Sequence, residues 1–257
     1  MSFLHAIILG VVEGLTEFLP ISSTGHLMIF TKILNMPLNS FVTSFNIYIQ
    51  LGAILAVVVL YLKKLLTKYN NVLYVISAFI PTIIIGLLIY PFVKKVLLTN
   101  LLVVSLALII GGIGLIIFEK YLPSLKLRQT SNSDLSVKKS FMVGICQMLA
   151  AIPGVSRSAA TIVGGMLMGI SREKIVEFSF FLAMPTMVAA SGLDLIKTGH
   201  NFSGQEWQMI LVGFIAAFVT AIIAIKWFIK YIQNHTFTAF GIYRIIAGIL
   251  VLLFLLK

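Results

Sequence analysis

The sequence contains little cysteine and few acidic residues. Its single cysteine, Cys146, excludes an intrachain disulfide and a cysteine-ligated metal cluster. Aspartate and glutamate number 8 among 257 residues, against 19 lysines and arginines, and charged residues make up only 11% of the chain. Soluble domains contain roughly a quarter charged residues. The shortage of charge therefore argues against a soluble globular protein.

Hydrophobic residues take the place of the missing charges. They make up 60% of the chain, and the mean hydropathy is +1.08. Several apolar runs approach the ~20 residues that a helix needs to cross a bilayer. We predict an all-α polytopic membrane protein with a single integral membrane domain over residues 1–257. The longest polar stretch, residues 119–139, is predicted to be a loop and leaves no room for a sizeable soluble domain.

The net charge of +11 raises the question of a nucleic-acid partner. The basic residues are scattered through short loops and form no basic domain, so we expect no nucleic acid and interpret them as topology signals and contacts to membrane lipids. Loops on one side of the predicted spans carry most of these residues. By the positive-inside rule that side is cytoplasmic, and both termini and the mouth of the first interrupted segment described below are extracytoplasmic.

Six apolar runs are long enough to cross the membrane as helices. They cover residues 43–62, 72–91, 101–118, 176–196, 208–228 and 239–256.

Two further apolar stretches, residues 1–40 and 140–170, are interrupted midway by proline and small polar residues. The interruptions read PISSTG at residues 20–25 and PGVSRS at residues 153–158. Each half is too short to cross alone, and irregular backbone at membrane depth is tolerated only where protein or a water-filled cavity surrounds it. We therefore predict two re-entrant helix-loop-helix hairpins that line a cavity.

The two interruptions resemble each other in sequence. Setting Gly10 on Gly144 without a gap places Ser22 on Ser156, and each interrupted stretch is followed by three predicted spans. We predict one repeat over residues 1–125 approximately and a second over residues 138–257. Three crossings invert the second copy relative to the first, and in such repeats functional sites lie where the broken helices meet. The two hairpins should therefore face each other.

Glu13 and Glu17 lie in the first apolar stretch and share one helical face, because they are four residues apart. Carboxylates at this depth are costly and need a reason. One reason is a divalent cation, Mg²⁺ or Ca²⁺, bound by Glu13 and Glu17 together with substrate oxygens. The other is that one glutamate is protonated and acts as an acid. The sequence leaves both open.

The first loop leads into a helix that begins near Ser23, and the free amide groups of a helix start bind anions. Ser22, Ser23 and Thr24 supply hydroxyl groups there. His26 follows three positions after Ser23 and is a candidate nucleophile, a candidate base for Ser23, or a candidate acid for the leaving group.

The second loop repeats this device. Gly154 permits close backbone approach, Ser156 and Ser158 offer hydroxyls, and Arg157 offers a planar fork of donors that matches phosphate oxygens. Arg157 lacks a carboxylate in its own segment, so Glu13, Glu17 or a substrate phosphate should be its counter-ion. The two loops together predict a phosphate site.

Structural roles compete with these functional ones. Ser22, Thr24 and Ser158 could serve only to satisfy backbone groups, His26 could be a packing residue, and the two glutamates could pair with basic residues to fix helix packing. Arg244, also in an apolar run, is predicted to bond a loop carbonyl or a lipid headgroup, with a phosphate contact as the alternative.

With these residues assembled, the chain resembles the undecaprenyl-diphosphate phosphatases of the bacitracin-resistance type. The resemblance rests on EGLTEFLPISSTGH at residues 13–26, PGVSRSAAT at residues 153–161 and EFSFFLAMP at residues 177–185. Ala159 departs from the glycine that is more common in the second motif, which removes no reactive group.

This resemblance implies an enzyme of the bacterial cell membrane that hydrolyses a C55 polyprenyl diphosphate to the monophosphate carrier and inorganic phosphate. Recycling of the carrier supports peptidoglycan synthesis, and raised activity gives bacitracin resistance. The resemblance also implies dependence on a divalent metal, an active site that opens to the extracytoplasmic side, and catalytic roles for Glu13, Glu17, Ser23, His26 and Arg157.

A transporter or flippase of polyprenyl phosphate is the main alternative, because secondary carriers share inverted repeats, broken helices and a midplane anion site. A noncatalytic lipid-binding scaffold is disfavoured, since it has little need of two intramembrane glutamates. The sequence leaves a homodimer open.

Overall fold

A computed structural model describes residues 1–37, 39–67, 69–92, 100–126, 134–198 and 202–255. Within these ranges the structure is helical and contains no β-strand. The helices are α1 (Phe3–Thr16), α2 (Ser23–Ile33), α3 (Ser40–Thr67), α4 (Tyr69–Phe92), α5 (Leu101–Lys126), α6 (Val137–Gln147), the 3₁₀ turn η2 (Met148–Ala151), α7 (Arg157–Leu167), α8 (Arg172–Thr198), α9 (Gly204–Asn234) and α10 (Thr238–Leu255).

Five helices within the described residues are long and apolar enough to cross a membrane. These spans are Ser40–Lys64, Leu101–Tyr121, Arg172–Ile196, Gly204–Asn234 and Thr238–Leu255. They coincide with five of the six predicted spans, although the last prediction reached residue 256, which lies outside the described residues. The sixth, residues 72–91, lies in α4, whose apolar part Val72–Leu88 is shorter.

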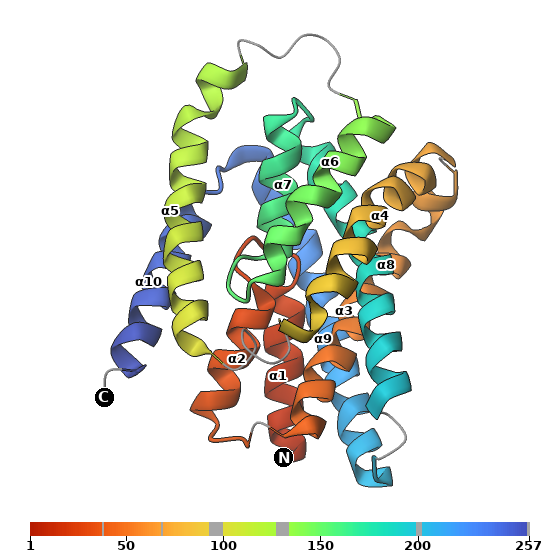
Figure 1. Ribbon diagram of the computed structural model, residues 1–257, viewed down its shortest axis with the longest axis vertical. Coiled ribbons are helices and arrows are strands. Elements are labelled where there is room, and N and C mark those ends of the chain that lie inside the picture. Colours follow the sequence, from red (N-terminus) through yellow and green to blue (C-terminus); the bar gives the residue numbers. More distant parts are fainter. Residues whose placement is uncertain (38, 68, 93–99, 127–133, 199–201, 256–257) are drawn as a thin grey trace.

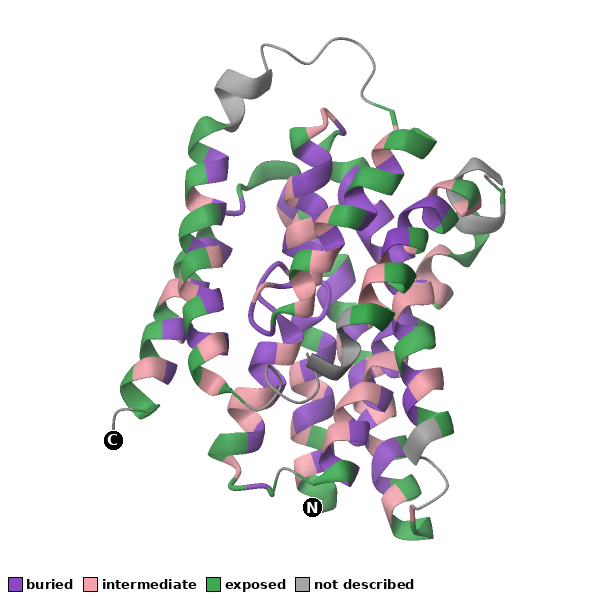
Figure 2. Cartoon of the chain, viewed as in Figure 1, coloured by how far each residue is buried: buried purple, intermediate pink, exposed green. Residues whose placement is uncertain are grey.

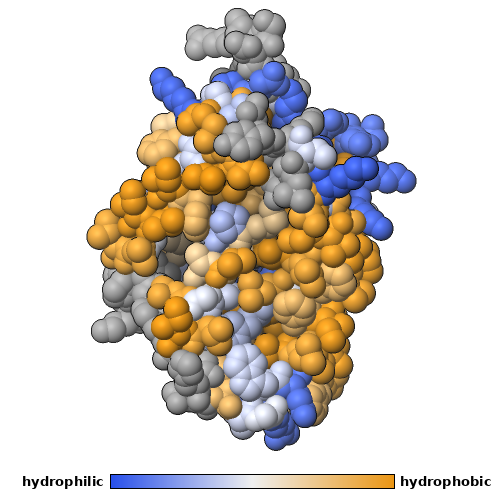
Figure 3. All heavy atoms as spheres, turned by 90° about the vertical axis from the view of Figure 1, so that its right-hand side faces the viewer, coloured by the Kyte–Doolittle hydropathy of each residue, from blue (hydrophilic) through white to orange (hydrophobic). Residues whose placement is uncertain are grey.

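The surface of these helices is apolar. Side chains such as Ile110 and Ile196 are 67% and 75% exposed, and Figure 3 shows a broad hydrophobic band with hydrophilic residues at both ends. Such a band suits hydrocarbon on its outside. The chain is a multi-pass membrane protein.

The two interrupted stretches form helix-turn-helix segments, α1–α2 and α6–η2–α7. Their turns lie at the middle of the molecule, side by side, with the long helices around them (Figure 1). Most residues of the two turns are buried, as the purple colour of these loops in Figure 2 shows. A buried turn must satisfy its backbone groups within the protein, and the site described below shows how it does so.

The predicted loop at residues 119–139 is wrong at its ends. Helix α5 continues to Lys126, and α6 begins at Val137. The last turns of α5 are held by Glu119, which is buried and accepts hydrogen bonds from Arg172 at 2.8 Å and from the backbone amide of Phe237 at 2.9 Å. The buried polar side chain of Glu119 is therefore compatible with a helix, because its hydrogen-bond partners lie on other segments. Residues 127–133 lie outside the described residues.

Helices from the first half of the chain pack against helices from the second half. Helix α1 packs against α9, and the corresponding α6 packs against α4, while α3 packs against α8 and α5 against α10. Gly10 and Gly144 permit the first two contacts. A Cβ atom on Gly10 would lie 2.3 Å from the carbonyl oxygen of Gly213, and one on Gly144 would lie 2.0 Å from that of Ala78. Both distances are shorter than non-bonded atoms tolerate, so each short helix rests directly on the backbone of its partner.

Replacement of Gly10 by alanine should push α1 away from α9. We expect Gly10→Ala to lower the free energy of unfolding by roughly 1–3 kcal/mol, the usual cost of overpacking. Thermal unfolding in detergent measures this effect. The matched control is Gly86→Ala in α4, where an added Cβ meets nothing within 4 Å. Equal melting temperatures for the two variants would contradict the close contact of α1 with α9.

Candidate active site

The first turn connects the end of α1 to the start of α2. Glu13 lies in the last turn of α1, and Glu17 is its C-cap, with its amide bonded to the carbonyl of Glu13 at 2.9 Å. Ser22 is the N-cap of α2 and has a φ of +72°, an uncommon value for a residue other than glycine. Strain of this kind often accompanies functional sites, where the surrounding structure holds the residue in place.

The second turn has the same construction. Ser156 caps α7 with a φ of +65°, and its hydroxyl accepts a hydrogen bond from the amide of Ala159 at 3.2 Å. Ser22 likewise accepts from the amide of Gly25 at 3.4 Å. Gly154 has a φ of +98°, and a Cβ atom there would lie 2.7 Å from the carbonyl oxygen of Val104. This glycine therefore serves both the turn and a close approach to α5.

The two turns contact each other. Arg157 at the start of α7 forms an ion pair with Glu17 at 2.6 Å, across 140 residues of sequence. Ser158 donates a hydrogen bond to the carbonyl of Leu19 at 2.7 Å, and its hydroxyl lies 3.0 Å from that of Ser156. Of the three counter-ions predicted for Arg157, which were Glu13, Glu17 and a substrate phosphate, the structure shows Glu17.

Ser23 lies beside Glu17 as well. Its hydroxyl donates a hydrogen bond to one carboxylate oxygen of Glu17, while Arg157 binds the other. Ser23 and Glu17 are 7% and 5% exposed, so this contact is shielded from solvent. A carboxylate bonded to a hydroxyl is the arrangement of a base and a nucleophile. Glu17 is therefore the candidate base next to Ser23.

The imidazole ring of His26 contacts Ser22 and Tyr243. Its Nδ1 lies 2.7 Å from the carbonyl oxygen of Ser22, and its Nε2 lies 2.7 Å from the hydroxyl oxygen of Tyr243 on α10. Because a carbonyl only accepts hydrogen bonds, Nδ1 carries the proton, and in the neutral ring Nε2 accepts from Tyr243. No hydrogen bond joins His26 to Ser23 within the described residues. The ring instead bonds the carbonyl of Ser22, the residue with the positive φ.

Arg244 forms hydrogen bonds to both turns. It is 1% exposed and donates to the carbonyls of Pro20 at 3.2 Å, Gly154 at 2.8 Å and Ala107 at 3.2 Å. The prediction of a loop carbonyl as its partner is confirmed for both loops at once. One guanidinium group thus satisfies backbone oxygens of the first turn, the second turn and α5.

Glu13 is the least satisfied polar group of the site. Its side chain is 0% exposed, and neither carboxylate oxygen has a hydrogen-bond partner within the described residues. Glu17 is close enough for the two carboxyl groups to interact directly, and Arg157 acts on Glu13 through its charge. A buried carboxylate without a partner is costly. A bound hard cation would satisfy it, since Mg²⁺ and Ca²⁺ take carboxylate oxygens as ligands.

The described residues contain no cluster of three or more histidine, cysteine or acidic side chains around a common point. Glu13 and Glu17 are therefore the carboxylates that would hold such a cation. The donor set fits Mg²⁺, which commonly binds one or two carboxylates and takes its other ligands from water and substrate phosphates.

Thr24 contributes least among the predicted residues. It is half-buried in the first turn of α2, and none of the hydrogen bonds described above includes it. The other predicted positions, in both turns, lie in one contiguous cluster.

A comparison with protein families matches residues 6–250 to the family described as bacitracin resistance protein BacA. The chain belongs to the BacA family. Curated relatives of this BacA-family protein are similar to it in sequence over nearly the whole chain. The undecaprenyl-diphosphatase of Aquifex aeolicus is 50% identical over 252 residues, which cover 98% of each chain.

Two further relatives carry the same name. The undecaprenyl-diphosphatase of Sulfurihydrogenibium sp. is 48% identical over 250 residues, covering 97% of this chain and 98% of the relative. That of Persephonella marina is 45% identical over 256 residues and covers 100% of both.

Sequence reasoning missed two partners in the site of this BacA-family chain. Ser179 on α8 accepts a hydrogen bond from Arg157 through its carbonyl at 2.6 Å, and its hydroxyl lies 2.7 Å from that of Thr161. Its position in the EFSFFLAMP motif was the available signal. Tyr243 had none, because it is one of eight tyrosines and its contact with His26 spans 217 residues.

Proposed function

We propose that the protein is an undecaprenyl-diphosphatase. It hydrolyses undecaprenyl diphosphate to undecaprenyl phosphate and inorganic phosphate, which recycles the lipid carrier for peptidoglycan synthesis and gives resistance to bacitracin. The observation that carries the proposal is the contact between the two turns, where Glu17 binds both the Ser23 hydroxyl and the Arg157 guanidinium. Membership in the BacA family and relatives named undecaprenyl-diphosphatase support it.

The residues suit a phosphoryl transfer in two steps. The Ser23 oxygen attacks the terminal phosphorus while Glu17 takes the hydroxyl proton, and the bond from that phosphorus to the bridging oxygen breaks to release the lipid monophosphate. Water then attacks the phosphorus of the phosphoserine, and the bond from that phosphorus to the Ser23 oxygen breaks. The Ser23 oxygen recovers its proton from Glu17, and the oxygen and protons of the water leave with inorganic phosphate. Arg157 supports both steps as the donor to the phosphoryl oxygens, since its Nε has no partner within the described residues.

His26 and Arg244 act on the position of these groups. His26 fixes the carbonyl of Ser22, the residue before Ser23, and Arg244 fixes Pro20 and Gly154 in the two turns. Alignment of this kind contributes strongly to phosphoryl transfer, since the protein supplies mainly position and electrostatic stabilisation.

The metal belongs to the same proposal. Glu13 and Glu17 would hold Mg²⁺ or Ca²⁺, which neutralises charge on the phosphate oxygens. The fully buried Glu13 beside Glu17 supports this assignment, since two neighbouring carboxyl groups at this depth need a cation or a proton to relieve their repulsion.

The membrane arrangement extends the proposal. The protein lies in the bacterial inner membrane with six crossing helices, α4 included, and with α1–α2 and α6–α7 as re-entrant hairpins of an inverted repeat. The pairing of α1 with α9 and α6 with α4, and the positive φ of both Ser22 and Ser156, support the repeat. The site opens to the extracytoplasmic side.

Removal of divalent metal tests the proposal. We expect purified protein in detergent to release phosphate from undecaprenyl diphosphate, EDTA to lower the rate at least roughly tenfold, and excess Mg²⁺ to restore it. EDTA that has been saturated with Mg²⁺ beforehand is the matched control. Full activity in EDTA would contradict the metal assignment. Retained lipid binding with no phosphate release under any condition would contradict the hydrolase and favour a carrier.

A further inference from the structure

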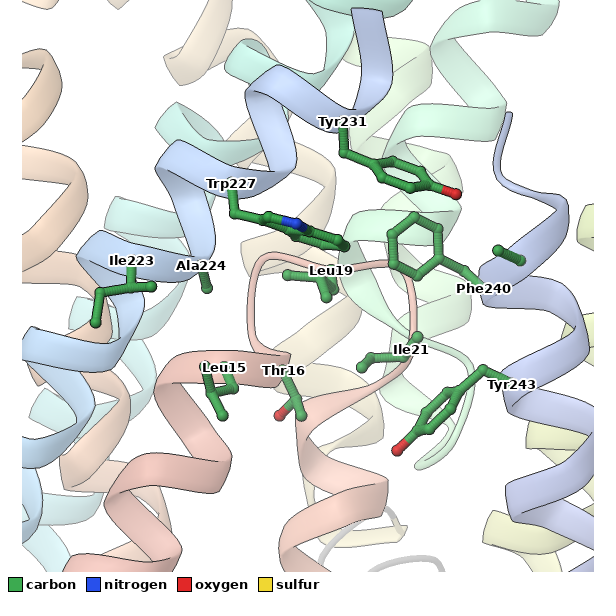
Figure 4. A pocket seen from close by; sticks show the side chains of 11 residues that line it. Leu15, Thr16, Leu19, Ile21, Ile223, Ala224, Trp227, Tyr231, Phe240 and Tyr243 are labelled. Atoms are coloured by element: carbon green, nitrogen blue, oxygen red, sulfur yellow. The ribbon is translucent and has the colours of Figure 1, made fainter. Parts of the chain in front are cut away.

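An apolar groove opens between α9 and α10. It encloses about 590 Å³, and Figure 4 shows Trp227 and Tyr231 on α9 opposite Phe240 and Tyr243 on α10. The groove exists because these consecutive helices diverge, since α9 packs against α1 and α3 while α10 packs against α5. Its volume falls within the range of small-molecule sites, roughly 300–1,000 Å³.

The floor of the groove is formed by the first turn, which connects α1 to α2. Leu19 and Ile21, on either side of Pro20, close it at the bottom, and Thr16 lines it next to Glu17 in sequence. Tyr243 forms one wall and bonds His26 at 2.7 Å. The groove therefore reaches the turn that carries Glu17 and Ser23.

The rim of the groove faces outward. Leu15, Ile223 and Trp227 are 42%, 59% and 49% exposed, although all are large and apolar. Exposed apolar side chains around an apolar hollow mark a binding surface, and in a membrane protein such a hollow opens to the hydrocarbon. A ligand can thus enter from the bilayer without crossing a polar surface.

A second apolar cavity lies on the other side of Tyr243, between α2, α5 and α10, with a volume of about 300 Å³. It differs in its chemistry. His26 and the exposed Lys32 both line it, and a cation beside a hydrocarbon chain is less suitable than the uncharged lining of the larger groove. Tyr243 contributes to both cavities and separates them.

We propose that the groove between α9 and α10 holds the part of the isoprenyl tail next to the diphosphate. This inference rests on the proposed function and adds the location of the tail. The aromatic walls at Trp227 and Phe240 bury the branched tail, the floor at Leu19 and Ile21 sets its first units beside the catalytic turn, and the remainder of the tail lies in the bilayer.

Three tryptophan substitutions at exposed positions test the location. Ile223→Trp fills the groove, Leu250→Trp fills the second cavity, and Ile215→Trp lies on α9 outside both. The replaced side chains are 59%, 61% and 51% exposed, so all three variants should fold. We expect Ile223→Trp to raise KM for undecaprenyl diphosphate about tenfold with kcat changed less than twofold, and the other two to match the wild type. Equal KM values for Ile223→Trp and Ile215→Trp, or an increase in Leu250→Trp alone, would overturn the inference.

A second measurement does not depend on turnover. A prenyl diphosphate that carries a photoreactive group in its first isoprene units is crosslinked to the wild-type protein and the labelled peptides are mapped. We expect label on residues 223–231 and 239–243. Label on α2, on the Leu250 side of α10, or spread evenly over the apolar surface as for any acyl chain, would overturn the inference. Label in the groove together with no phosphate release would refute the proposed hydrolysis and leave the lipid site standing.

Discussion

Glu17→Gln should lower kcat for phosphate release by about 10²–10⁴, the range that general acid-base catalysis contributes. Glutamine keeps the size of the side chain, but it has one amide oxygen where glutamate offers two acceptors. It cannot take the proton of Ser23 and accept from Arg157 at once. It also removes one of the two carboxylates proposed to hold the metal. Phosphate release and thermal unfolding in detergent measure the two effects.

Glu119→Gln is the matched control. Glu119 is also buried and also pairs with an arginine, Arg172, at 2.8 Å, but it lies in α5, away from the two turns. We expect it to lower the melting temperature and to leave kcat within about threefold of the wild type, because the change removes a structural ion pair only. Similar losses of kcat in both variants would show that Glu17 acts through stability and not through chemistry.

Arg244→Met should disrupt both turns together. Methionine fills similar space but leaves the carbonyls of Pro20, Ala107 and Gly154 without this donor. Since an unsatisfied buried polar group costs about 1–3 kcal/mol, we expect the free energy of unfolding to fall by roughly 3 kcal/mol or more. The two turns would also lose their common tie, and we expect kcat to fall about 100-fold, as small displacements of reacting groups do.

Arg172→Met provides the comparison for Arg244. Arg172 also binds a carbonyl, that of His235 at 2.6 Å, and a carboxylate, but it lies at the start of α8. The Arg172→Met variant should have a lower free energy of unfolding but an unchanged kcat, measured at a temperature where both variants remain folded. If Arg244→Met kept wild-type kcat under those conditions, the guanidinium would be a packing element with no influence on the turns.

The sequence predicted those parts of the fold that depend on length and polarity. Apolar runs locate the spans because a bilayer demands continuous hydrophobicity, and interruptions such as residues 153–158 locate the turns because proline and glycine end helices. The end of α5 escaped prediction for the opposite reason. Glu119 and its neighbours look like a loop until the partners Arg172 and Phe237, far away in sequence, are known.

The sequence predicted which residues form the candidate site better than it predicted the contacts between them. Buried charges are rare enough to mark Glu17 and Arg157, but the sequence left Glu13, Glu17 and a substrate phosphate open as the counter-ion of Arg157, and only the structure shows that it is Glu17. The direction of His26 did not follow, because several rotamers are open to a histidine on a helix and the tyrosine that binds it stands on α10. The groove likewise depends on the divergence of α9 and α10, which arises from packing against other helices.

The most direct test of the account is a structure of the protein with Mg²⁺ and a polyprenyl diphosphonate, in which a methylene group replaces the bridging oxygen. We predict that the terminal phosphonate lies between the two turns, within hydrogen-bond distance of the Arg157 guanidinium and the Ser23 hydroxyl, with the metal on Glu13 and Glu17. A headgroup bound elsewhere, with the Glu17–Arg157 pair unchanged, would contradict it.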